Sequence, residues 1–176
     1  MGTFTIILSS AVISGLVSAA ISGWFNLRSK QNEYANGYYK LILERRLAAY
    51  EEIDSLIDSI KIAVVDTDNR PHHRLFSIDD NRLGVYKTLD RTMSKSLWLS
   101  DELFNITREL NLLVFEKVPA NVSLIEFGKC NYKVIAELRT RMEKVRIKDM
   151  LTLHDVPAFL KAKKSLDSYS ELKPSE

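Results

Sequence analysis

Hydrophobic and polar positions divide the chain into an uncharged N-terminal stretch and a longer part with helical periodicity. The stretch from Phe4 to Leu27 contains no charged residue. As an α-helix it would be about 36 Å long, enough to cross a hydrocarbon core about 30 Å thick. The pattern therefore predicts a transmembrane helix in residues 1–27.

Two rows of small residues, each at four-residue spacing, lie side by side on this predicted helix. Small residues let helix backbones approach closely, and serine hydroxyls can hydrogen-bond across a helix pair. A serine row could instead line a narrow water-filled pore, because a pore lining needs polar groups and no large side chains. The stretch leaves the pore and the dry bundle open. The residues of this predicted pore or oligomer face are Ser10, Ser14, Gly15, Ser18, Ala19, Ser22 and Gly23.

The flanks of the stretch predict its orientation. Arg28 and Lys30 follow it at once, whereas no charged side chain precedes it. The positive-inside rule then places the N-terminus outside and the main domain in the cytoplasm. A cleaved signal peptide is the alternative, but it would need a basic first region and a shorter apolar core.

From Tyr38 onward, apolar residues recur at steps of three and four. This spacing predicts helices over about 38–65, 83–97, 101–117, 123–153 and 155–166. Ser100, followed by Asp101 and Glu102, is typical of a helix N-terminus. No period-two run and no Asn-Gly or Asp-Gly pair indicates a strand or hairpin. The predicted fold is all-α: a membrane helix in 1–27, a joint or continuing helix in 28–37, an antiparallel helical bundle in 38–166 and a flexible tail in 167–176.

Composition excludes several classes of function. The net charge of +2 is too balanced for a protein that binds duplex nucleic acid. The single cysteine, Cys130, rules out an internal disulfide and fits a reducing compartment. The chain has no Gly-rich phosphate loop, HExxH, CxxC or GxSxG motif, and its histidines have no carboxylate at metal-ligand spacing. We therefore expect no catalytic residue, no metal and no cofactor, and we predict that the protein is not an enzyme.

Two basic segments are candidates for binding a phosphorylated ligand, because phosphates are commonly bound by Arg and Lys. One is the predicted loop over residues 66–80 and its exit, and the other is the second half of the predicted helix over 123–153. A solvated loop and a solvated helix face, with Glu137 and Glu143 between the basic residues, are the alternatives. The candidate ligand-binding residues are Arg70, His72, His73, Arg74, Arg82, Arg139, Arg141 and Arg146.

The layout resembles a class of small bacterial membrane proteins that act in phage defence. The resemblance rests on the small-residue face, the polar exit RSKQNEY from Arg28 to Tyr34, and the helix start YYKLILERRLAAYEEI from Tyr38 to Ile53. It is nearest to the membrane effectors of the Hailong system. That resemblance implies an oligomeric ion channel in the bacterial inner membrane, controlled by an oligodeoxyadenylate signal from a partner nucleotidyltransferase.

Two classes of function follow from these patterns. The first is a gated membrane effector: a homo-oligomer in the lipid bilayer that responds to a nucleotide or oligonucleotide through its cytoplasmic domain. The second is a non-conducting membrane anchor or scaffold whose helical bundle recruits a cytoplasmic partner protein.

Overall fold

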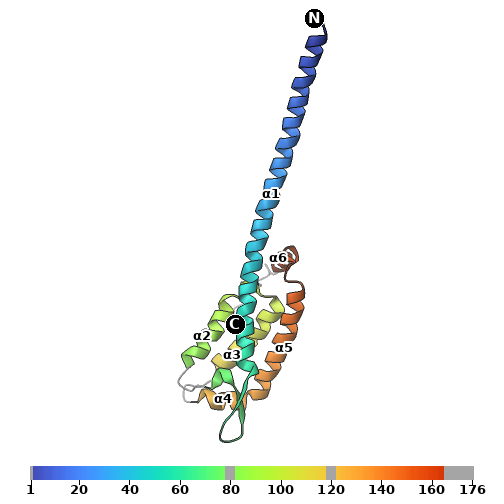
Figure 1. Cartoon of the computed structure of the whole chain (residues 1–176). Helices are drawn as coiled ribbons and strands as arrows, with labels where there is room; N and C mark the ends of the chain where they lie inside the picture. The colour runs from blue at the N-terminus through green and yellow to red at the C-terminus, as the bar shows by residue number, and fades with distance from the viewer. Residues whose placement is uncertain (1, 78–81, 118–121, 165–176) are drawn as a thin grey trace, which may run out of the picture. The chain divides into compact units, whose positions relative to one another are not determined.

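The computed structural model describes residues 2–77, 82–117 and 122–164, with side chains from Ser14 onward except those of Lys117 and Lys164. The described chain is mostly helical (Figure 1). Its α-helices and strands, in order, are α1 (Gly2–Lys61), β1 (Ala63–Val65), β2 (Pro71–His73), α2 (Arg82–Ser94), α3 (Asp101–Lys117), α4 (Leu124–Cys130), α5 (Tyr132–Leu151) and α6 (Val156–Lys164). Two short 3-10 helices are η1 (Arg74–Phe76) and η3 (Ser96–Trp98).

The chain forms two compact units, residues 1–42 and residues 43–176. The N-terminal unit is part of a single helix, because α1 is continuous through residues 28–37, where the sequence left a joint open. The C-terminal unit contains the rest of α1 and all the other elements. The two units are described separately below.

The predicted transmembrane helix in residues 1–27 is not supported. In the part of the chain that the structure describes, no helix is both long and apolar enough to cross a membrane. Among the described side chains, the uncharged run extends from Ser14 only to Leu27, before Arg28. That is about 21 Å of helix, less than a hydrocarbon core requires. The predicted fold class is corrected accordingly, and the part of the prediction that rests on residues 4–13 lies outside the described side chains.

The helical-bundle character predicted for the C-terminal unit is confirmed. The second half of α1 lies among α2, α3 and α5 (Figure 1), and ion pairs from Glu52 to α2 and from Asp54 to α5 join these elements. The side chains of the core come from every one of these helices. Those that are almost completely buried include Tyr50, Ile53, Leu56, Ile60, Leu89, Leu103, Leu110, Ile135 and Met142.

The prediction that the chain contains no strand is wrong. β1 and β2 form a two-stranded antiparallel sheet in which Val64 pairs with His72. The five-residue connection closes with the backbone N–H of Asn69 donating to the carbonyl of Asp66 at 3.0 Å, and Asn69 itself has a positive φ of 59°. Longer hairpin loops of this kind carry a weaker sequence signal than two-residue turns. The predicted helix over 38–65 consequently ends at Lys61.

Two more helix boundaries differ from their predictions. The helix predicted over 123–153 is divided at Asn131, whose side-chain amide donates to the carbonyl of Phe127 at 2.9 Å. A side chain that bonds its own preceding turn competes with the helical backbone pattern. The helix predicted over 83–97 ends at Ser94 and is followed by η3. The tail predicted in 167–176 lies outside the described residues.

The predicted helix start at Ser100 is confirmed. Its Oγ accepts from the backbone N–H of Leu103 at 3.2 Å, which satisfies one of the unpaired donors of the first turn of α3. Ser123 caps α4 by accepting from Ile125 at 3.2 Å, and Asp155 caps α6 by accepting from Ala158 at 3.0 Å. Each cap sits at the residue before its helix, as the polar-then-apolar pattern requires.

Gly128 sets how closely α4 approaches the hairpin. A Cβ at this position would lie 3.0 Å from Phe76 Cβ and 3.3 Å from His72 Cβ, so these groups would have to move apart. We expect Gly128→Ala to lower the free energy of unfolding by about 1–3 kcal/mol, the usual cost of overpacking a core. Urea denaturation measures this change.

Gly37→Ala is the matched control, because nothing lies within 4 Å of its Cβ position in α1. Helix propensity predicts that this exchange is neutral or stabilising by up to about 1 kcal/mol. Equal effects of the two substitutions would contradict the close packing assigned to Gly128.

Candidate functional site

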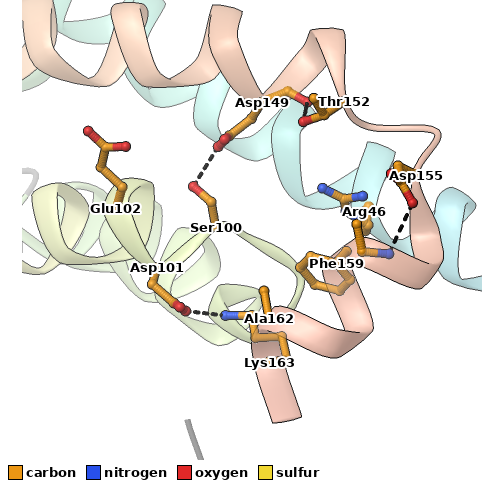
Figure 2. Close-up of a pocket in the computed structure, with 11 residues that line it drawn as sticks. Arg46, Ser100, Asp101, Glu102, Asp149, Thr152, Asp155, Phe159, Ala162 and Lys163 are labelled. Atoms are coloured by element: carbon orange, nitrogen blue, oxygen red, sulfur yellow. Dashed lines mark hydrogen bonds and ion pairs between the residues drawn. The ribbon is translucent and has the colours of Figure 1, made fainter. Parts of the chain in front are cut away.

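A pocket of about 440 Å³ lies in the C-terminal unit between Arg46 of α1, the start of α3, the end of α5, and α6 (Figure 2). It combines a buried carboxylate, a buried guanidinium and an aromatic ring. Among the pockets of the described chain it has the densest set of buried polar side chains, so it was taken as the candidate site. The sequence did not single it out, because its members come from four separate helices.

Asp149 is the buried carboxylate of this pocket. Its Oδ2 accepts hydrogen bonds from the Tyr50 hydroxyl at 2.8 Å and from the Ser100 hydroxyl at 2.5 Å. Burial, together with this bond and the negative charge of Asp149, raises the pKa of Tyr50 to about 12. One carboxylate therefore joins α1, the cap of α3, and α5.

Arg46 is only 3% exposed. Its Nη1 donates to the carbonyl of Leu153 at 2.7 Å, and its guanidinium lies 4.1 Å from the centre of the Phe159 ring. A cation over an aromatic face is attracted by the electron-rich ring. Arg46 therefore connects α1 to the turn after α5 and to α6.

The remaining charged groups of the pocket are engaged in holding helices together. Asp101 pairs with Lys163 of α6 at 2.7 Å, and Glu102 pairs with Lys148 of α5 at 2.9 Å. The Ser100 hydroxyl donates to Asp149 and accepts from Leu103, so it is used by the structure rather than presented as a nucleophile. The geometry of this pocket supports a structural joint that fixes α6.

The candidate residues of the predicted loop have different environments. Arg70 is half exposed and pairs with Asp68 at 2.7 Å and with Glu126 at 2.8 Å. His72 and His73 are buried in β2, Arg74 is exposed at the start of η1, and Arg82 donates to the carbonyl of Val122. The segment is thus folded against α4 instead of forming an open basic loop.

The three arginines of the basic helix point to different neighbours. Arg141 makes a two-pronged pair with Glu109 at 2.6 and 3.0 Å, and Arg146 pairs with Asp54 at 2.6 Å. Arg139 pairs with Glu143 at 3.9 Å. Arg141 and Arg146 line two separate pockets. The structure does not gather the predicted ligand residues into one site, and binding of a phosphorylated ligand stays a prediction.

Lys129 organises a cluster that sequence reasoning missed. Its Nζ lies 2.8 Å from Asp66, 3.0 Å from Asp68 and 3.0 Å from Glu126. These carboxylates raise the pKa of Lys129, with Asp66 contributing most, and Lys129 in turn lowers the pKa of Asp66 and Glu126. The cluster fastens the hairpin turn to α4. The i, i+3 pair of Glu126 and Lys129 was its only local signal in the sequence.

In the N-terminal unit, the side chains of the predicted small-residue face are exposed from Ser14 to Gly23. Nothing lies within 4 Å of a Cβ built on Gly15 or on Gly23. Ser10 lies outside the described side chains. Within the described residues, no group of three or more potential metal-ligating side chains comes together.

No protein-family model, no curated protein and no solved structure matches this chain. The resemblance to phage-defence effectors therefore stays a prediction, as does the absence of enzymatic activity.

Replacing Tyr50 by Phe tests the role of the buried carboxylate. We expect Tyr50→Phe to lower the free energy of unfolding at pH 7 by about 1–2 kcal/mol, because Asp149 loses one of its buried donors. The raised pKa of Tyr50 also predicts a pH effect in the wild type. The folded state keeps the phenol proton up to about pH 12, so stability falls as the pH rises above the ordinary tyrosine value of about 10.

Urea denaturation at pH 7 and at alkaline pH measures both effects. Tyr86→Phe is the control, because the Tyr86 ring is half-buried and stacks on Phe115 without a partner such as Asp149. Equal losses in the two variants at pH 7 would remove Asp149 from its assigned role.

Proposed function

We propose that the protein is an assembly protein whose N-terminal helical unit associates with the same unit of a second copy. The C-terminal unit would then serve as a folded module that recruits a partner protein. One observation carries the proposal: from Ser14 to Leu41 every side chain of the N-terminal unit is exposed, including large apolar ones.

The exposed apolar side chains are large and close together. Leu16 is 67% exposed, Trp24 56% and Phe25 60%. Burying a side chain of this size contributes about 1.5–3 kcal/mol, so a cover for this helix would be strongly favoured. Contiguous exposed apolar surface is typical of an interaction site.

A second copy is the cover that fits these residues best. Gly15 and Gly23 leave open space on one face, which lets another helix backbone approach closely. The run from Ser14 to Leu27 carries no charge that would select a partner of opposite charge. A face of small residues is complementary to itself, and symmetric pairing of identical faces is the commonest way in which proteins form dimers.

The C-terminal unit supports the role of a binding module. It has its own core, and capped helices, the Asp149 joint and the Lys129 cluster fix its surface. Its larger exposed apolar side chains include Leu83 and Phe115, which fit contact with another protein. The ion-channel activity, the role in phage defence, the inner-membrane location and the nucleotide signal stay predictions.

Association of the full chain is the test. Sedimentation-velocity experiments over a range of concentrations should show a homo-oligomer for the wild type. The double variant Gly15→Ile with Ala19→Ile should weaken association at least about tenfold, because the added side chains keep the helices apart. Ala20→Ile is the matched control, since on an α-helix it lies on the opposite side from this face.

Two results would contradict the proposal. One is a wild-type chain that stays monomeric at all concentrations, including one that instead binds lipid vesicles, since a lipid surface would then be the cover. The other is a Gly15/Ala19 variant that associates as strongly as the Ala20 variant.

A further inference from the structure

Two adjacent histidines are buried where the hairpin packs on the bundle. His72 is 3% exposed and His73 is 1% exposed, and both belong to β2, which contacts α4 and α5. Imidazole is the side chain whose ordinary pKa, about 6.5, lies closest to neutral pH. A buried pair of this kind makes the packing of the hairpin sensitive to protons.

His73 is held at both ring nitrogens. Nδ1 contacts the carbonyl oxygen of Ile60, Nε2 lies 3.1 Å from the carbonyl oxygen of Tyr132, and the ring stacks on the Tyr132 ring at 4.5 Å. The two carbonyls favour the protonated ring. Burial, with the charges of Arg139 and His72, opposes protonation more strongly and lowers the pKa of His73.

His72 is in the opposite situation. Neither of its ring nitrogens has a hydrogen-bond partner among the described residues. The ring lies in the β2–α4 contact, where its Cβ is close to Gly128. A charge added to a buried group without a partner costs several kcal/mol, and the usual response is that the group moves to water.

The charged groups around the pair do not offer a counter-ion. Arg139 of α5 adds a like charge beside His73. On the hairpin turn and α4, the carboxylates Asp66, Asp68 and Glu126 are bound by Lys129 and Arg70. At the end of α1, Lys61 is exposed and cationic.

We propose that the His72–His73 pair is an acid-sensitive lock, and that protonation of the pair releases the β1–β2 hairpin from α4 and α5. Below about pH 6.5 an exposed histidine binds a proton, whereas the packed pair resists doing so. The released form therefore gains relative to the packed form as the pH falls. The packed form, in which both rings are neutral, is the state at pH 7.5 and above.

Hydrogen exchange of the full chain, followed by mass spectrometry on peptides covering residues 62–76, measures the opening. After correction for the intrinsic exchange rate, the opening constant of the wild type should rise between pH 7.5 and pH 5.5. Each histidine that takes up its proton only on opening contributes a rise of about tenfold. His72→Phe should remove most of this rise, because Phe has a similar shape and no proton to gain.

His154→Gln is the control, since His154 is an exposed histidine in the same chain and its loss should leave the rise unchanged. An unchanged opening constant in the wild type, or a full rise that persists in His72→Phe, would overturn the proposal. If His72→Phe fails to fold, proton NMR of the wild-type imidazoles decides: a His72 ring that titrates while the hairpin amides stay protected contradicts the lock, and one that titrates only as protection is lost supports it.

Discussion

The C-terminal unit depends on one buried carboxylate. Asp149 accepts from Tyr50 at 2.8 Å and from Ser100 at 2.5 Å, so it fixes α1 against the start of α3 and the end of α5. A buried carboxylate without such donors would destabilise the fold, because charge is poorly solvated in a protein interior. Arg46 extends the same joint to α6 through Leu153 and Phe159.

Periodicity predicted the parts of the fold that local sequence controls. The seam from Tyr50 to Ile60 is buried as expected, and Ser100 caps its helix. The hairpin was missed because its strands have three residues each and its turn uses Asn69 in place of an Asn-Gly pair. The transmembrane helix was inferred from apolar length alone, and no described helix meets that requirement.

The predicted site was less well anticipated, for a physical reason. Charge along the sequence shows where Arg and Lys occur, but not which carboxylates meet them after folding. Arg141 meets Glu109 and Arg146 meets Asp54, each from another helix. His72 and His73 looked like polar loop residues, yet strand pairing and α4 bury both. The Asp149 joint is assembled from contacts between distant residues, and no local motif announces it.

Self-association through the small face of the N-terminal unit is the central claim, and cysteine cross-linking tests it most directly. Cys130 is exposed and would be replaced by Ser. Single cysteines would then be placed at Ser18, Ser22, Val17 and Trp24 of the full chain. The account predicts disulfide-linked dimers at Ser18 and Ser22, and few at Val17 and Trp24, which lie toward the other side of the helix. Equal cross-linking at all four positions, or none at Ser18 and Ser22, would contradict it.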